Sequence, residues 1–260
     1  MNIIVCIKQV PNTTEIRIDP VTNTLIREGV ESILNPFDLY AIEEAIRLKE
    51  QYGGKVTAVS MGPQQVEEAL REALSLGVDE IILLSDRKFA GADTWATSYT
   101  LASAIKKIGD YDIIFAGQQA IDGDTAQVGP GIAAHLNLPQ TCFIRKIESY
   151  EPGSMIVQRL MEDGYDRLQV SLPAVVTVVK EINTPRLPSL RGKMKAKSVE
   201  LKIWNCADLG LDEHDVGLNG SPTQVVSIFS PKLEKQGEKF EGDADAAVDK
   251  IIEHLKKFKP

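Results

Sequence analysis

The first 140 residues of the chain alternate between short β-rich runs and helical patterns, and this alternation limits the possible folds more than any other feature. Strands that alternate with helices of this length form a mainly parallel sheet with helices on both faces. The sequence therefore predicts an α/β fold with a doubly wound sheet. The expected strands are Ile3–Lys8, Lys55–Ser60, Glu80–Ser85 and Tyr111–Ala116, and the expected helices are Asp38–Gln51, Pro63–Leu76, Thr94–Ile108 and Thr125–Leu136.

Two additions to this sheet are expected. An insertion, EIRIDPVTNTLIREGV, alternates apolar and polar residues around an Asp-Pro-Val-Thr-Asn turn, which is typical of a β-hairpin. After Pro139 the pattern changes to antiparallel strands, followed by a β-branched run that predicts a buried strand returning to the main sheet. These strands are Thr141–Ser149, Ser154–Leu160, Asp166–Ser171 and, as the buried one, Ala174–Lys180.

The composition is that of an ordinary soluble protein, with 43% hydrophobic residues and a net charge of −8. An acidic chain is a poor nucleic-acid binder, because that function needs a basic surface. No apolar run is long enough to span a membrane, and the N-terminus MNIIVCIKQVPN enters a strand directly, so we expect a cytoplasmic protein without a signal peptide. Cys6, Cys142 and Cys206 are as scattered as the three histidines, which predicts neither a disulfide framework nor a metal site.

The C-terminal part contains a basic segment and a polar tail. The segment PRLPSLRGKMKAK, Pro185–Lys197, has five basic residues and no acid, and its two prolines and its glycine predict a loop. It is either a solvated charged surface or, with Leu187 and Leu190 beside arginines, a docking site for an acidic partner. Beyond a polar stretch, a final amphipathic helix must pack on this chain or on a partner. We expect residues 1–200 to form one domain and residues 201–260 a C-terminal arm. The apolar face of the final helix holds Val248, Ile251, Ile252, Leu255 and Phe258.

Polar residues mark the starts of the expected helices. Asn35, before Pro36, is expected to cap the first helix, and the stretch around Asp93 starts the third helix in a similar way. Asp124, with Gln127 three residues later, forms a capping-box pattern. All of these helix starts could direct N–H groups toward one edge of the sheet.

The stretch GQQAIDGDTAQVGP, Gly117–Pro130, follows the fourth expected strand and has the glycines of a phosphate loop without a lysine or arginine. The chain also lacks GxxxxGKS/T, a GxGxxG after the first strand, and GxSxG. A kinase, a hydrolase or an adenylating enzyme is therefore disfavoured, and no catalytic residue is assigned.

A ligand in an open α/β sheet binds at the carboxyl ends of the strands, where the strand order reverses. An order of 3-2-1-4 places that reversal between the loops Lys8–Thr14 and Gly117–Asp124. Helix N–H groups can hold a phosphate there without lysine, and Asp122 and Asp124 suit a helix cap and the hydroxyls of a ribose or ribityl chain. On composition alone, a tight capped turn that binds nothing fits equally well. The small residues that would let a ligand approach the backbone are Gly123, Ala126, Gly129 and Gly131.

Several segments in the same order resemble the β subunit of the electron transfer flavoproteins, across essentially the whole chain. They are CIKQVP, GVESILNPFDLYAIEEAIRLKE, VSMGP, GQQAIDGDTAQVG, LPAVVTV and PRLPSLRGKMKAK. The resemblance implies a Rossmann-like fold that binds an adenine nucleotide, and a heterodimer with an α subunit that carries an FAD.

The resemblance also implies the residues of the site. It places residues 183–197 as a recognition loop for an acyl-CoA dehydrogenase, with Leu190 as its hydrophobic anchor, and the C-terminal helix on the α subunit. The docking residues are Leu187, Leu190, Arg191 and Lys193. The nucleotide would contact Cys6, Asn35, Pro36, Phe37, Asp38, Met61, Gln118, Gln119, Ala120, Ile121, Asp122, Gly123, Asp124, Thr125, Ala126, Gln127, Val128 and Gly129.

The chain departs from the AMP-binding members of this family after Ala-Ile-Asp, where it lacks their further acids. Together with FAGADTWAT, this loop is similar to the subgroup in which a second FAD replaces AMP and electron pairs from NADH are split between a high-potential and a low-potential acceptor. That resemblance places Asp93, Thr94 and Thr97 near the flavin ring, although they also fit simple capping of a helix. Ferredoxin or flavodoxin would be the low-potential acceptor. The alternatives are a β subunit that holds AMP structurally, and a stand-alone adenine-nucleotide-binding regulatory domain.

Overall fold

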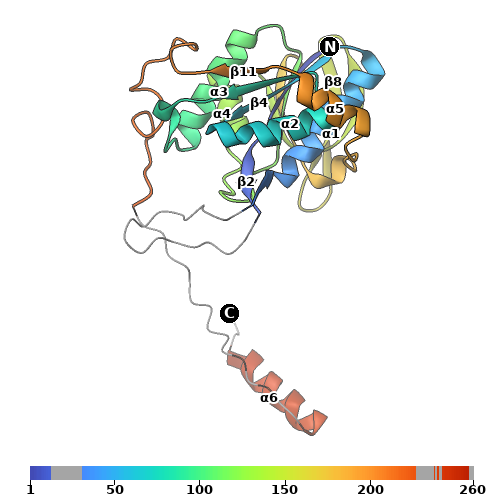
Figure 1. The fold of residues 1–260 in the computed structure, drawn as a ribbon. Helices are drawn as coiled ribbons and strands as arrows, with labels where there is room; N and C mark the ends of the chain where they lie inside the picture. The colour runs from blue at the N-terminus through green and yellow to red at the C-terminus, as the bar shows by residue number, and fades with distance from the viewer. Residues whose placement is uncertain (13–30, 227–236, 238, 240–241, 258–260) are drawn as a thin grey trace. The chain divides into compact units, whose positions relative to one another are not determined.

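The computed structural model describes residues 1–12, 31–226, 237, 239 and 242–257 (Figure 1). Residues Met1–Val226 form one compact unit. In the second unit, Ser227–Pro260, the described element is helix α6, Ala244–Lys257. Within the described parts of the chain, no helix is long and apolar enough to cross a membrane.

The compact unit is built on a nine-stranded sheet in the order β11-β5-β4-β1-β6-β10-β7-β8-β9. The neighbouring strands from β11 to β7 are parallel, and β8 and β9 continue the sheet in antiparallel pairing. A separate antiparallel pair joins β2 to β3. The strands are β1 Asn2–Cys6, β2 Gln9–Pro11, β3 Ser32–Leu34, β4 Lys55–Met61, β5 Glu80–Leu84, β6 Ile113–Gly117, β7 Gln140–Glu151, β8 Ser154–Leu160, β9 Tyr165–Ser171, β10 Ala174–Val178 and β11 Leu201–Trp204.

Helices cover both faces of this sheet, because alternate strand residues point to opposite sides. In β1, Ile3 and Val5 join the core under α1, α2 and α5, whereas Ile4 and Cys6 join the core under α3 and α4 (Figure 1). The helices are α1 Pro36–Tyr52, α2 Glu67–Leu76, α3 Thr94–Ile108, α4 Val128–Leu136 and α5 Leu190–Ser198, with short 3₁₀ turns η1 Gln64–Val66, η2 Arg87–Phe89 and η3 Lys180–Ile182.

The predicted α/β architecture is confirmed. The first four expected strands are β1, β4, β5 and β6, and their order β5-β4-β1-β6 is the expected 3-2-1-4. The run Ala174–Val178 is fully buried and lies between β6 and β7, so the expected return to the main sheet is also confirmed. The strand order therefore reverses beside β1 and β6, at their carboxyl ends.

Two expectations differ from the structure. The basic segment was expected to be a loop, but it contains α5, which is capped by Ser189 Oγ accepting from Gly192 N at 2.9 Å. Gly192 is required there for packing rather than for breaking the helix, because a Cβ on it would lie 2.0 Å from Ser75 O of α2. The polar stretch after residue 200 also contributes a strand, β11, to the edge of the sheet.

Other expectations fall partly outside the described residues. The predicted hairpin in residues 15–30 lies outside them, although β2 and β3 pair on either side of it. The final helix is present as α6, and Val248, Ile251, Ile252 and Leu255 are exposed on it, while Phe258 is outside the described part.

Candidate functional site

The reversal point of the strand order is braced by Asp38, in the first turn of α1. Its Oδ2 accepts a hydrogen bond from the backbone N of Lys8 at 2.7 Å, and its Oδ1 accepts one from the backbone N of Gly117 at 3.2 Å. Gly117 permits this close approach, because a Cβ on it would lie 2.5 Å from Asp38 Oδ1. One buried carboxyl group thus ties the chain that leaves β1 to the end of β6.

Burial controls the protonation of this group. Desolvation raises the pKa of Asp38 to about 7, against the lowering effect of its hydrogen bonds from Lys8 and Gly117. Burial, and then the nearby Asp38 carboxyl, raise the pKa of the Cys6 thiol to about 12. Cys6 is therefore a protonated thiol at neutral pH and a poor nucleophile.

Asn35 fixes the loop that follows β6. Its Nδ2 donates to Gln119 O at 2.9 Å, and its Oδ1 accepts from Ile121 N at 3.2 Å. Asn35 occupies the N-cap position of α1, but its side chain makes no capping bond there. The expected cap is therefore wrong in its chemistry, because the long-range partners take both ends of the amide.

Lys8 supplies the positive charge that the Gly117–Pro130 stretch lacks. Its Nζ lies 2.6 Å from Asp122 Oδ1, across the reversal point. Sequence reasoning did not assign Lys8 to the site. The available signal was its position, as the basic residue of the segment that follows the first strand.

The capping box predicted at Asp124 is wrong. Helix α4 begins at Val128, with Gln127 at its N-cap and no side-chain capping bond. Asp124 instead has a left-handed φ of 50°, and its Oδ1 accepts from Gln119 Nε2 at 2.7 Å. Because this backbone conformation turns the chain away from the helix, Asp124 shapes the loop and does not cap α4.

The small residues of this stretch have different roles. A Cβ on Gly129 would lie 2.5 Å from Thr177 Cγ2 of β10, and one on Gly131 would lie 2.5 Å from Ser98 Oγ of α3. These two glycines let α4 pack closely on its neighbours. At Gly123, in contrast, no described atom lies within 4 Å of an added Cβ, so a ligand could approach the backbone there.

A cleft of about 560 Å³ lies beside the N-terminal ends of α3 and α4, and we call it the α3–α4 cleft. Asp93 caps α3, with its Oδ1 accepting from Ala96 N at 3.0 Å, so the capping interpretation of Asp93 is confirmed. Thr97 is not among the described residues that line the cleft. The lining residues are Asp93, Thr94, Trp95, Ser98, Gln127, Pro130, Gly131, Ala134, Gln140, Pro222 and Thr223.

The sequence-predicted residues therefore fall into two groups. The first group is at the reversal point, where Asn35 and Asp38 hold Lys8 and the loop from Gly117 to Asp124. The second group, Asp93, Thr94 and Gln127, lines the α3–α4 cleft. The other predicted residues lie on the same elements: Cys6 in β1, Pro36 and Phe37 in α1, Met61 at the end of β4, Gln118 to Ala126 in the loop, and Val128 and Gly129 in α4.

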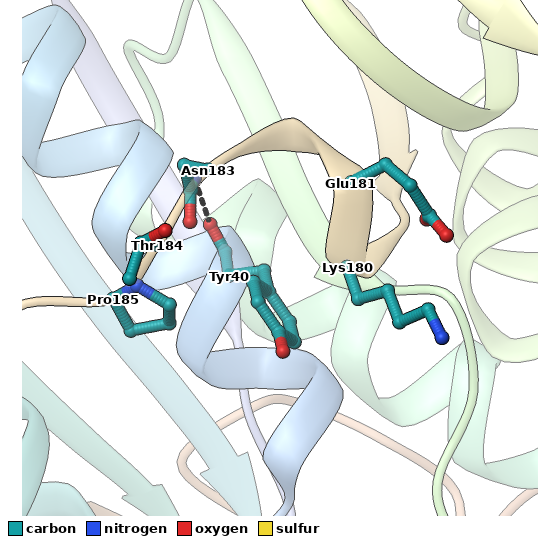
Figure 2. A pocket seen from close by; sticks show the side chains of 6 residues that line it. All are labelled: Tyr40, Lys180, Glu181, Asn183, Thr184 and Pro185. Atoms are coloured by element: carbon teal, nitrogen blue, oxygen red, sulfur yellow. Dashed lines mark hydrogen bonds between the residues drawn. The ribbon is translucent and has the colours of Figure 1, made fainter.

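A second, shallower hollow of about 340 Å³ lies between α1 and the chain after β10 (Figure 2). Asn183 connects its two sides, since its Nδ2 donates to Tyr40 O and to Glu44 Oε2, both at 3.0 Å. The residues that line it are Tyr40, Lys180, Glu181, Asn183, Thr184 and Pro185. The hollow marks the start of the basic segment.

The basic segment presents an apolar surface that α1 holds in place. Leu187 and Leu190 are 89% and 79% exposed, and Met194, one turn beyond Leu190, is 68% exposed. Arg186 anchors the segment by donating to Glu43 Oε2 at 2.8 Å and to Glu50 Oε1 at 2.6 Å. Met194 was missed from sequence, although its spacing of four residues from Leu190 places both on one helical face. Arg191 and Lys193 are exposed beside this surface.

Comparison with known proteins identifies the family. Residues 22–209 match the family model described as the electron transfer flavoprotein domain. The chain is 55% identical over 256 residues to the electron transfer flavoprotein subunit beta of Thermoanaerobacterium thermosaccharolyticum, with 98% of each chain covered. The chain belongs to the electron transfer flavoprotein β-subunit family.

Two further relatives of this electron transfer flavoprotein β subunit carry different descriptions. The chain is 52% identical over 243 residues to the caffeyl-CoA reductase-Etf complex subunit CarD of Acetobacterium woodii, with 93% of this chain and 92% of the relative covered. It is 43% identical over 268 residues to the protein FixA of Azorhizobium caulinodans, with 100% of this chain and 95% of the relative covered. The chain is thus similar to relatives that carry different descriptions, one of them as a subunit of a complex.

Proposed function

We propose that this β subunit holds an FAD of its own and takes part in flavin-based electron bifurcation. The observation that carries the proposal is the α3–α4 cleft, which is lined by residues other than those at the reversal point and includes Gln127, from the end of the loop that follows β6. Its volume of about 560 Å³ lies within the usual range of small-molecule sites. An AMP at the loop would not need this additional space.

The residues present fit the polar parts of FAD. The first-turn N–H groups of a helix have no partner within the helix and attract anions. The start of α4, which has no side-chain cap, borders the cleft in this way, whereas the start of α3 is capped by Asp93. Lys8 adds an ammonium group at the loop. Asp122, Asp124 and Gln119 offer oxygens and an amide that suit ribose and ribityl hydroxyls.

The protein residues would bind, orient and shield the cofactor. When bound, FAD supplies the electron chemistry, with NADH as the proposed donor. Asp38 and Asn35 keep the loop in position, and the N–H groups at the start of α4 would hold the anionic part. The protonated Cys6 thiol takes no part in covalent chemistry.

The partners follow from the surfaces of the chain. A β subunit implies an α subunit, and the exposed apolar face of α6 suits packing on it. We therefore assign nucleotide binding to residues 1–200 together with Pro222 and Thr223, which line the α3–α4 cleft, and α-subunit packing to the final helix of residues 201–260. Leu187, Leu190 and Met194, with Arg191 and Lys193 beside them, suit docking of an acyl-CoA dehydrogenase, and the description of the Acetobacterium relative as part of a caffeyl-CoA reductase complex supports an acyl-CoA-type partner. Ferredoxin or flavodoxin would accept the low-potential electron, and a cytoplasmic location suits these partners.

The alternative is a subunit that holds AMP as a structural ligand at the reversal point. The loop contacts made by Asn35 and Lys8 would serve that function equally well. In this case electrons would pass from the dehydrogenase through the α-subunit FAD alone. Membership of the β-subunit family disfavours the third possibility, a stand-alone regulatory domain.

Anaerobic titration with NADH separates the first two functions. We expect NADH to reduce the flavin of the purified heterodimer rapidly, without a dehydrogenase present. Flavin that stays oxidised with NADH but is reduced by an acyl-CoA dehydrogenase and its substrate would refute the bifurcating function and support the AMP-holding one.

The docking surface is tested with Leu190→Ala. Removing this exposed side chain should slow electron transfer with the dehydrogenase about thirtyfold at subsaturating concentrations, because an anchor at the centre of an interface contributes about 2 kcal/mol. Flavin content should stay normal. Ile203→Ala, at a partly exposed position on β11, is the matched control. Equal transfer rates for the Leu190 variant and the wild type would refute the docking role.

A further inference from the structure

Residues 217–223, which we call the strap, lie against the start of α3. Asp93 N donates to Ser221 Oγ at 2.8 Å, and Asp93 Oδ2 accepts from Thr223 N at 3.0 Å and from Thr223 Oγ1 at 2.7 Å. The two segments are 128 and 130 residues apart in sequence. Asp93 therefore holds the strap with its backbone N and its Oδ2, and caps α3 with its Oδ1.

Close backbone packing supports the same arrangement. Leu218 N donates to Ala90 O at 3.0 Å, and a Cβ on Gly217 would lie 1.9 Å from Lys88 O. Ser221 Oγ also donates to Gly217 O at 2.7 Å, which closes the strap on itself. The strap thus has a defined position along residues 88–93.

This position makes the strap one side of the α3–α4 cleft. Pro222 and Thr223 line the cleft together with Gln127, Pro130 and Gly131 from the other side. The cleft remains open to solvent on its other sides, and without the strap it would lose the border formed by Pro222 and Thr223.

We infer that the strap is a wall of the flavin site, held by Asp93 as a positioning residue, and that it selects FAD over a smaller adenine nucleotide. The inference rests on the proposed function. Its physical basis is that the strap borders the cleft at the start of α3, whereas the loop contacts that suit AMP involve Lys8 and Asn35. Loss of the wall should weaken the binding of FAD and leave the binding of AMP unchanged.

The charge of Asp93 is consistent with this role. Burial alone would raise the pKa of Asp93, but the hydrogen bonds from Ala96 and Thr223 outweigh it and hold the pKa below its ordinary value. Asp93 is therefore ionised at neutral pH, and hydrogen bonds to an ionised acceptor are the stronger kind.

The experiment uses the heterodimer with the full-length chain. Thr223→Val removes the hydroxyl bond to Asp93 at nearly constant volume, and Thr223→Ser restores it. Thr184→Val, which lies at the other hollow, is the matched control. FAD binding is followed by quenching of Trp95 fluorescence, since Trp95 lines the cleft, and AMP binding by its competition with FAD. Hydrogen exchange of the strap amides, with and without FAD, is the second measurement.

We expect Thr223→Val to raise the Kd for FAD about tenfold, equivalent to about 1.4 kcal/mol, with an unchanged Kd for AMP. Thr223→Ser and Thr184→Val should bind both ligands as the wild type does. FAD should slow exchange of the strap amides in the wild type and fail to do so in Thr223→Val.

Two results would overturn the inference while FAD binding by the wild type stands. The first is an unchanged Kd for FAD in Thr223→Val. The second is an equal loss of affinity for FAD and AMP in this variant, which would mean that Thr223 has a general structural role. A wild type that binds AMP and shows no quenching by FAD would instead refute the proposed function, and the flavin wall with it.

Discussion

Replacement of Asp38 by Asn should change the pH dependence of stability in a way that follows from its burial. Asp38 has a pKa of about 7 in the folded chain against an ordinary value of 3.8, so the folded state binds its proton more tightly. The stabilising contribution of this group is therefore complete below about pH 3.8 and is lost as the pH rises through about 7. The difference between these two pKa values corresponds to about 4 kcal/mol of the free energy of unfolding in total, and about 2.5 kcal/mol of it is lost between pH 5 and pH 8.

The substitution removes the titration and part of the hydrogen bonding. The amide introduced by Asp38→Asn would offer a single oxygen to the N–H groups of Lys8 and Gly117, so one of them loses its acceptor, at a cost of about 1–3 kcal/mol. At pH 5 the Asp38→Asn variant should therefore be less stable than the wild type. By pH 8 the wild type should have lost about 2.5 kcal/mol that the variant does not lose, and the difference between them should close or reverse.

Urea unfolding of the heterodimer, followed by circular dichroism at several pH values and one protein concentration, measures this difference. Asp163→Asn, at an exposed position, is the control and should follow the wild type at every pH. A constant difference between wild type and Asp38→Asn from pH 5 to pH 8 would refute the assigned protonation behaviour.

Three further substitutions test the site and the docking segment. Lys8→Gln should change the free energy of unfolding by less than about 1 kcal/mol, because the ion pair of Lys8 is exposed. The same substitution should weaken FAD binding about tenfold in titrations, and an unchanged affinity would contradict a role of Lys8 in the site. Arg186→Lys loses the paired contacts of Arg186 to two carboxylates and should raise the KM for the dehydrogenase about tenfold at constant flavin content. The control Arg87→Lys, at an exposed position, should leave this KM unchanged. Equal KM values for the two variants would contradict the role of Arg186 in anchoring the basic segment. Gly192→Ala should lower the free energy of unfolding, measured in urea, by about 2 kcal/mol, because an added Cβ would meet α2. The control Gly123→Ala should leave the free energy of unfolding unchanged. Equal stabilities of the two variants would show that α5 can move away from α2 freely.

Much of the fold could be predicted because it depends on local patterns. The period-2 and period-3.6 patterns of the first 140 residues were sufficient to identify the four central strands, and Thr94–Ile108 was predicted with its observed bounds. The order 3-2-1-4 was taken from doubly wound sheets in general, and the structure has it. Helix α5 was not predicted because Pro188 and Gly192 are ordinary helix breakers. Here Pro188 precedes the cap, and Gly192 serves contact with another helix, which no local pattern contains.

The candidate site was predictable in its location and less so in its interactions. The loops expected at the reversal of strand order do flank it, but the partners of Asn35 and Lys8 are 84 and 114 residues away in sequence. A capping pattern at Asn35 or Asp124 describes the favoured local bond. Long-range contacts replaced it at Asn35, and a bond from Gln119 within the same loop replaced it at Asp124. The wall around Thr223 could not be found from sequence, because its segment has no motif and depends on contact with Asp93.

The nucleotide content of the purified heterodimer tests the central claim most directly, since this subunit is proposed to hold an FAD in addition to that of the α subunit. Cofactors are released from the full-length heterodimer by acid and quantified by chromatography against the protein concentration. The proposed function predicts two FAD and no AMP for each heterodimer. One FAD and one AMP would contradict it.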